Sequence, residues 1–174
     1  SVVPVSAARP SEVTAALASS ADEVMVDLSP VSHRETGADR RALLEHLGAM
    51  PAGKTLLSLQ ADPEDPMSWE AFEGVVAALG SRVGACVLPD VKSSAAVRRL
   101  DARLTEVESR LGLALGHIRI EARIQTEDAL EQAYDLATAS RRLSALIFDI
   151  PVADLFRQGR LVVTRKTRSI RKAE

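Results

Sequence analysis

The chain has 174 residues and a mass of 18.7 kDa, which allows one domain with a sizeable hydrophobic core. Hydrophobic residues make up 46% of the sequence and charged residues 26%, a balance that excludes a disordered chain. Aromatic residues account for only 3%, and no apolar run approaches the roughly 20 residues of a membrane span, so we expect a core of small aliphatic side chains.

Short apolar runs alternate along the chain with segments of helical periodicity. The runs have the length of strands and most are β-branched; they are Val2–Val5, Val24–Leu28, Thr55–Leu59, Ala85–Leu88, Ile118–Ile124, Leu143–Ile150 and, more weakly, Leu161–Thr164. Helices are expected between them, at Ser11–Ser20, Asp39–Leu47, Ser68–Leu79, Ser93–Leu111 and Glu127–Ser140. The expected N-caps are Ser11, Ser68, Ser93 and Thr126.

This repeated strand–helix pattern, with a period of roughly 30 residues, predicts a parallel sheet with right-handed crossovers. An open doubly wound sheet and a barrel both satisfy the pattern. The first strand–helix connection, Ser6 to Pro10, contains none of the glycines that let a pyrophosphate approach the backbone. A dinucleotide-binding fold is therefore disfavoured.

Several segments match, in register, the motifs of one family of barrel enzymes. They are Ser1–Ser19 with its Arg9-Pro10 pair, Val24–Leu28, Val87–Ser93, Ile118–Thr126, and Ala133–Asp149 with its Ala-Tyr-Asp-Leu-Ala-Thr-Ala-Ser stretch. In these segments, over about residues 1–150, the chain resembles the citrate lyase beta-subunit-like (HpcH/HpaI aldolase) family.

The resemblance implies an α/β fold of the TIM-type (β/α) barrel class, with the active site at the C-terminal ends of the strands. It also implies a Claisen- or aldol-type lyase that acts on a CoA thioester of a small hydroxy or keto acid. Such an enzyme uses Mg²⁺ held by a Glu and an Asp, and an arginine on the third strand, to stabilise an enolate.

The same resemblance implies that most of this catalytic machinery is replaced. Ser58 stands where the family has its arginine, and Gln125 stands where it has the metal-binding glutamate. The other replaced positions are Ser29, Pro30, Asp90, Lys92, Asp128, Pro151 and Val152. Because Mg²⁺ is rarely held without carboxylates, no metal site and no cofactor are expected, and Mg²⁺ and a CoA thioester are expected only if the family activity is retained.

Two residues of the family pattern survive, Arg9 and Asp27, and they are the relict catalytic candidates. For Arg9 the alternatives are a salt bridge within its own barrel and contact with a ligand. For Asp27 they are a hydrogen bond at the end of its strand and a relict catalytic role.

Polar residues alternate on the fifth strand at Arg119, Glu121, Arg123 and Gln125, so all four project to one face. The resemblance places Gln125 in the active site, so this face is expected to line the barrel interior. Buried charges cost several kcal/mol unless they are paired, so Glu121 must pair with Arg119 or Arg123 or the face must be wet. The face is either the wet side of an unclosed barrel or a relocated polar site for an anionic ligand.

The length indicates an incomplete barrel of about six βα units out of eight, because a full barrel usually needs at least about 200 residues. We expect a barrel-like domain over residues 1–156 and a basic C-terminal strand or tail over residues 157–174. The tail carries a formal charge of +6 and the remaining chain −8. The open sheet edges are covered by Leu161–Thr164 and the tail, by a second chain, or by a longer natural form of the protein.

Two functions follow from these observations. The first is a catalytically impaired homologue that acts as a structural or regulatory subunit, in a homo-oligomer or in a complex with a related full-length lyase subunit. The alternative is an active Mg²⁺-dependent carbon–carbon lyase. A nucleic-acid anchor in the basic tail is disfavoured because the tail lacks interleaved aromatic residues. No membrane partner is expected.

The cysteine and histidine content indicates a cellular compartment and disfavours a zinc site. The single cysteine, Cys86, can form no intramolecular disulfide, so we expect the reducing cytoplasm. The histidines His33, His46 and His117 are scattered, which disfavours a zinc site.

Overall fold

The computed structural model describes residues 1–29, 37–48 and 55–149. Six parallel strands form one sheet within these residues, in the order β1-β2-β3-β4-β5-β6. They are β1 Val2–Ser6, β2 Glu23–Asp27, β3 Leu56–Gln60, β4 Val83–Leu88, β5 Arg119–Ile124 and β6 Leu143–Phe148. The six expected strands are confirmed with small shifts at their ends, while Leu161–Thr164 and the basic tail lie outside the described residues.

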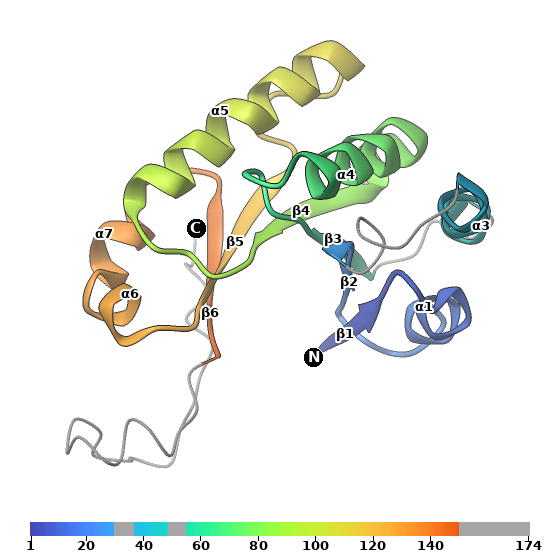
Figure 1. The fold of residues 1–174 in the computed structure, drawn as a ribbon, viewed down its shortest axis with the longest axis horizontal. Coiled ribbons are helices and arrows are strands. Elements are labelled where there is room, and N and C mark those ends of the chain that lie inside the picture. Colours follow the sequence, from blue (N-terminus) through green and yellow to red (C-terminus); the bar gives the residue numbers. More distant parts are fainter. Residues whose placement is uncertain (30–36, 49–54, 150–174) are drawn as a thin grey trace.

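The strand order identifies the architecture. Each strand pairs with the next strand in sequence, as in a barrel, whereas a doubly wound sheet reverses its order at a switch point. The sheet curls with its helices on the outer side, and β1 and β6 are its two edges (Figure 1). The expected incomplete TIM-type barrel is therefore confirmed as a half-barrel of six parallel strands.

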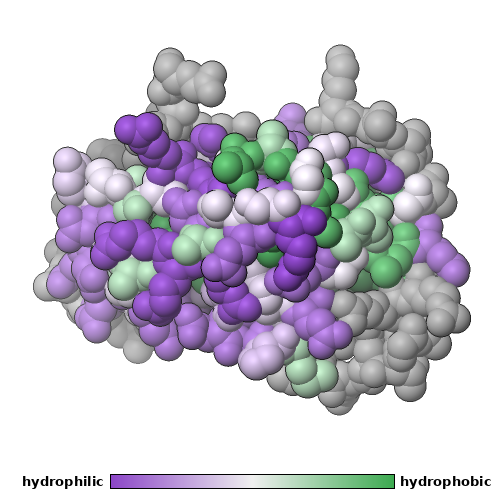
Figure 2. All heavy atoms as spheres, turned by 90° about the horizontal axis from the view of Figure 1, so that it is seen from above, coloured by the Kyte–Doolittle hydropathy of each residue, from purple (hydrophilic) through white to green (hydrophobic). Residues whose placement is uncertain are grey.

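The helices cover the convex side of the sheet (Figure 1). They are α1 Pro10–Leu17, α3 Gly37–Gly48, α4 Pro66–Leu79, the short 3₁₀ helix η1 Gly80–Arg82, α5 Ser94–Leu111, α6 Glu127–Glu131 and α7 Ala133–Ala137. Seen from above, over α5 and α4, the surface is mostly hydrophilic (Figure 2). Among the described residues, no helix is both long enough and apolar enough to cross a membrane.

Two of the expected N-caps are confirmed. Ser93 accepts a hydrogen bond from the backbone N–H of Ala96 at the start of α5, and Thr126 accepts one from Ala129 at the start of α6. The single helix expected over Glu127–Ser140 is wrong, because the segment divides into α6 and α7. Gln132, between them, has φ −90° and ψ 9°, outside the helical region.

The other two expected N-caps, Ser11 and Ser68, are wrong. Helices α1 and α4 begin earlier, at Pro10 and Pro66, because proline has a fixed helical φ and lacks the N–H that the first turn would leave unpaired. The side chain of Asp65 caps α4 by accepting from the N–H of Met67, whereas Arg9 precedes α1 without a side-chain cap.

The core lies between the sheet and the helices. Alternate residues of each strand point outward into it, including Val24, Val26, Leu59 and Ile120, all fully buried. Cys86 also lies in this core, and burial raises the pKa of its thiol well above the ordinary value. The thiolate is therefore suppressed, which makes Cys86 a packing residue and not a nucleophile.

A buried ion-pair network ties α5 to the starts of β5 and β6. Arg142, 6% exposed, donates to Asp101 at 2.6 Å and to both carboxylate oxygens of Glu108 at 2.8 Å. Glu108 is fully buried and also accepts from the N–H groups of Gly116 and Ile118, each at 2.8 Å. Four donated hydrogen bonds satisfy this carboxylate, which is the condition for keeping a charge in a core.

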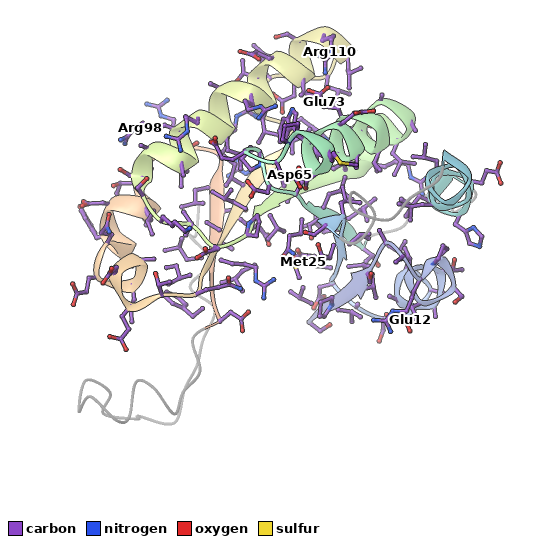
Figure 3. The ribbon with its side chains drawn as sticks, in the orientation of Figure 1. Glu12, Met25, Asp65, Glu73, Arg98 and Arg110 are labelled. Atoms are coloured by element: carbon purple, nitrogen blue, oxygen red, sulfur yellow. The ribbon has the colours of Figure 1, made fainter. Side chains whose placement is uncertain are left out.

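The neighbouring helices α4 and α5 are joined at the surface as well. Glu73 and Arg110 form an ion pair at 2.8 Å across the two helices (Figure 3). The guanidinium of Arg103 lies 4.3 Å from the ring centroid of Trp69, and that ring stacks on Phe72. These contacts fix the outer layer over β3 and β4.

Replacing Arg142 should be strongly destabilising. Arg142→Met leaves Glu108 buried without its counter-ion, so the free energy of unfolding should decrease by about 3–5 kcal/mol. The exposed neighbour provides the control, since Arg141→Met should change the stability by no more than about 0.5 kcal/mol. Urea unfolding followed by circular dichroism measures both values. Equal stability of the two variants would show that the network does not support the fold.

The fold should also be sensitive to acid through Glu108. Burial by itself raises the pKa of this carboxyl, but hydrogen bonds from Arg142, Ile118 and Gly116 outweigh burial and hold its pKa below the usual value of about 4.3. Such a group stabilises the fold above its unfolded-state pKa, and this contribution is lost as the pH falls through the folded-state pKa. We therefore expect the free energy of unfolding to decrease below about pH 4.3.

Urea unfolding from about pH 3 to pH 7 measures this dependence. The decrease at acid pH should be smaller in Glu108→Gln, whose amide does not titrate. Parallel pH profiles for the two proteins would contradict the role of Glu108.

Candidate functional site

A cavity of about 640 Å³ occupies the concave side of the half-barrel, between the two edge strands. Met25 projects from β2 into this side (Figure 3). The charged and polar residues of its lining are Ser6, Arg9, Glu12, Glu23, Asp27, Gln60, Glu121, Arg123 and Asp149. The apolar residues are Val2, Pro4, Val5, Met25, Ala145, Leu146, Ile147 and Phe148.

Near the N-terminal ends of the strands, the cavity meets a buried carboxylate. Glu23, at the start of β2, is 2% exposed and accepts a 2.6 Å hydrogen bond from the hydroxyl of Ser58 on β3. Ser58 is itself fully buried. The position to which the sequence resemblance assigns the family's arginine therefore holds a neutral hydroxyl, and this hydroxyl donates a hydrogen bond to Glu23.

At the C-terminal ends of the strands, Arg123 extends from β5 across β4. Its Nη1 donates to Oε1 of Gln60 on β3 at 2.6 Å, and its Nη2 forms an ion pair with Asp149, just after β6. Asp149 also accepts a hydrogen bond of 3.4 Å from Nε2 of Gln125. Three strands are thus linked by one guanidinium, whose Nε is buried and has no partner among the described residues.

The two relict candidates both line the cavity. Arg9 forms an ion pair of 2.7 Å with Glu12 in the first turn of α1, and its side chain is 63% exposed. Asp27, at the end of β2, accepts a 3.0 Å hydrogen bond from the N–H of Ser29. Each residue is therefore engaged within its own βα unit, at the mouth of the cavity.

The polar face expected on β5 is divided by the structure. Glu121, 6% exposed, and Arg123 line the cavity, while Arg119 and Gln125 are exposed and lie outside its lining. The residues that alternate with these polar side chains point to the helix side and are fully buried; they are Ile118, Ile120, Ala122 and Ile124. The structure thus brings together Arg9, Asp27, Glu121 and Arg123.

Glu23, Gln60 and Asp149 are not among the site residues expected from the sequence, although all three contact other polar residues on the concave side. Their positions in the strands contained a usable signal. Glu23 and Asp27 are four positions apart on β2, and because side chains alternate along a strand, both project to the same face. Gln60 pairs with Asp27 in the register of β2 and β3. The expected strands are defined by their apolar residues, so polar residues at the strand ends are not selected by that pattern.

The described residues at this end of the sheet do not fit Mg²⁺. Within residues 1–29, 37–48 and 55–149, no three His, Cys, Asp or Glu side chains are grouped so that they could hold a metal ion. Arg123 neutralises the carboxylate of Asp149, and the side-chain amide of Gln125 donates a hydrogen bond to the same carboxylate. A hard cation requires charged oxygen ligands, and here a guanidinium already holds the carboxylate. Pro151 and Val152 lie outside the described residues.

Two of the replaced positions, which follow the end of β4, also take no part in the cavity. Asp90 and Lys92 pair with each other, with 3.4 Å between Nζ and Oδ2, and neither residue lines the cavity.

A curled parallel sheet with helices outside and a polar cavity inside defines a protein of the (β/α)-barrel class, in which ligands meet the C-terminal ends of the strands. The model of the HpcH/HpaI aldolase/citrate lyase family matches residues 1–164. The chain belongs to this family, and the resemblance inferred from its motifs is confirmed.

Solved structures share the fold. The malate synthase of Haloferax volcanii, in a lead(II) complex, has a TM-score of 0.66 at 14% identity, covering 85% of this chain and 49% of its own. The same enzyme in a ternary complex with pyruvate and acetyl-CoA has a TM-score of 0.57 at 16% identity, covering 73% and 39%.

A citrate lyase from Burkholderia xenovorans LB400 has a TM-score of 0.56 at 15% identity, covering 73% of this chain and 40% of its own. The chain spans about half the length of these structures or less. No curated protein matches it significantly. At these identities the likeness concerns the fold alone.

Proposed function

We propose that this chain is a catalytically impaired member of the HpcH/HpaI aldolase/citrate lyase family that serves as a structural or regulatory subunit. One observation carries the proposal. The guanidinium of Arg123 is held between Gln60 and Asp149 at the C-terminal ends of the strands, where a family enzyme would need a metal-binding carboxylate free of such a partner.

The chemistry of the family explains why this arrangement is unfavourable for a lyase. Making or breaking a carbon–carbon bond beside a thioester requires an enolate, whose charge a metal ion and an arginine would spread. Here Ser58 is hydrogen-bonded to Glu23 and offers no charge, and Gln125 offers an amide. We therefore propose that the chain functions without Mg²⁺ and without a CoA thioester.

The second candidate is an active Mg²⁺-dependent lyase that acts on the CoA thioester of a small hydroxy or keto acid. It is favoured by the malate synthase whose structure contains pyruvate and acetyl-CoA, since that enzyme shares the fold of this chain. The side chains available to bind a metal ion at the cavity argue against an active lyase.

Among the residues that the structure describes, no strand pairs with the outer edges of β1 and β6, which supports assembly with another chain. Val2 on β1 and Phe148 on β6 are 47% and 49% exposed, and both lie on edge strands beside the cavity. Exposed apolar area costs about 25 cal/mol per Å², and unpaired strand edges favour pairing. We propose a homo-oligomer or a complex with a related full-length lyase subunit. A reducing cytoplasm suits the free thiol of Cys86.

Magnesium binding and lyase activity should both be absent. Calorimetric titration is expected to detect no Mg²⁺ binding tighter than about 1 mM, because the described residues include no group of three His, Cys, Asp or Glu side chains that could hold a metal ion. A thiol-release assay with acetyl-CoA and glyoxylate should show no turnover, with a full-length malate synthase as the positive control. Stoichiometric Mg²⁺ binding that Glu121→Gln abolishes would overturn the proposal and establish a relocated metal site.

The assembly is tested by light scattering at micromolar concentration, first alone and then with a full-length family member. We expect a mass above that of the 18.7 kDa monomer in at least one case. Phe148→Lys should weaken the association at least about tenfold, because it places a charge on the exposed edge. Tyr134→Lys, at an aromatic residue that is 80% exposed on α7, is the matched control and should have no effect. A compact monomer with a cooperative melt in both experiments would contradict the proposed assembly.

A further inference from the structure

The two edge strands differ in the backbone groups that they turn away from the sheet. On β1 the N–H of Ala7 donates to the carbonyl of Asp27, and the carbonyl of Ser1 accepts from the N–H of Glu23. The backbone of the odd-numbered residues therefore faces β2, and the backbone of Pro4 points outward. Proline has no N–H, so a strand added beside β1 would lose a hydrogen bond at its centre. This edge is protected against pairing.

The free edge of β6 has no such gap. The N–H of Asp149 donates to the carbonyl of Ile124 on β5 at 2.9 Å. Because backbone direction alternates along a strand, the N–H and C=O groups of Leu146 and Phe148 point away from β5. The register shift of this strand pair lies at its other end and does not disturb the alternation here. Within the described residues no strand pairs with these groups.

The side chains along the same edge are apolar. Residues 145–148 read Ala-Leu-Ile-Phe, with Leu146 and Ile147 half-buried and Phe148 49% exposed. A further strand laid along β6 would bury apolar area as well as pair the backbone groups. Backbone pairing supplies the affinity of such an added strand, and its side chains supply the specificity. Of the two edges, β6 is the one built to accept another strand.

The charges at the two ends of β6 favour one orientation of that strand. Arg141, just before β6, is exposed and belongs to none of the ion pairs between described residues. Asp149, just after β6, is half-exposed, and its contacts with Arg123 and Gln125 both reach Oδ2, so its Oδ1 can accept from a further donor. A second β6 in antiparallel orientation places the arginine of each strand near the aspartate of the other. A parallel copy would bring like charges together, which is unfavourable.

A second copy of this chain is the partner that fits the edge. It carries the same unpaired strand with the same end charges, so the contact is self-complementary about a two-fold axis. A closed eight-stranded barrel, in contrast, has no free strand edge to offer.

We propose that two copies of this chain associate through their β6 strands, paired antiparallel, so that the two half-barrels share one continuous sheet. The inference rests on the assembly part of the proposed function and names its partner and its contact surface. It is independent of whether the cavity retains catalysis.

Hydrogen exchange of single backbone amides tests the seam directly, in the 174-residue chain at about 5 µM and about 500 µM. The amides of Leu146 and Phe148 should exchange at least about tenfold more slowly at the higher concentration, because the partner strand protects them. The amides of Val2 and Ser6, on the outer edge of β1, should exchange equally fast at both concentrations and are the internal reference.

Proline variants separate the backbone contact from the side-chain contact. Phe148→Pro removes an outward N–H that β5 does not use, whereas Phe148→Ala removes the ring and keeps the N–H. Phe148→Pro should weaken dimerisation at least about tenfold more than Phe148→Ala in sedimentation equilibrium. Val2→Pro, at the protected edge, should change it by less than about twofold. Circular dichroism reports whether each variant is folded.

A charge reversal tests the orientation. Arg141→Glu places like charges beside Asp149 of the second copy and should weaken dimerisation at least about tenfold at low ionic strength. Arg98→Glu, the same change on the exposed face of α5 (Figure 3), is the matched control and should change it by less than about twofold. Equal effects of the two reversals would contradict the antiparallel arrangement.

The outcomes distinguish this inference from the proposed function. A dimer whose Leu146 and Phe148 amides stay unprotected would overturn the β6 seam and leave the proposed assembly in place. A chain that stays monomeric alone but binds a full-length family member would also overturn only the seam. Catalytic impairment is tested separately, by magnesium binding and thiol release.

Discussion

The structure depends on one constraint, which is that each strand of the sheet has to bury one face beneath a helix while its other face turns toward the inside of the half-barrel. On β2 the outward residues Val24 and Val26 are fully buried, whereas the inward residues are Glu23, Met25 and Asp27. A closed barrel fills its interior with packed aliphatic layers. The half-barrel leaves a cavity there, so its inward positions tolerate charge.

Arginines act in two different ways on the two sides of this sheet. Arg142 lies in the dry layer beneath α5, where Glu108 and Asp101 satisfy it, and it holds the helix against the strands. Arg123 lies beside the cavity, where Gln60 and Asp149 hold it and one of its nitrogens stays unpaired within the described chain. The first is a structural ion pair, and the second lies beside the cavity at the C-terminal ends of the strands.

The chain thus keeps the architecture of the HpcH/HpaI aldolase/citrate lyase family, and we propose that its cavity has a different chemistry. Fold and family place the site, but the side chains decide what it can do. Ser58 and Gln125 are neutral where the family resemblance calls for charged groups, and Glu23 and Glu121 add negative charge deeper in the cavity. These differences support a role in binding and assembly.

The sequence alone determined the alternation of strands and helices, the aliphatic outer face of the strands and the inward direction of Glu121 and Arg123 on β5, because all of these follow from periods of 2 and 3.6 residues. It did not determine where α1 and α4 begin or that Glu127–Ser140 divides at Gln132, since local backbone geometry decided these. Only the tertiary structure decided the contacts of the site. Gln60 and Arg123 are 63 residues apart in the chain, and Ser58 and Glu23 are 35 apart. Such pairs form only when the register of neighbouring strands and the curl of the whole sheet bring the two side chains to the same place, and no local pattern encodes that.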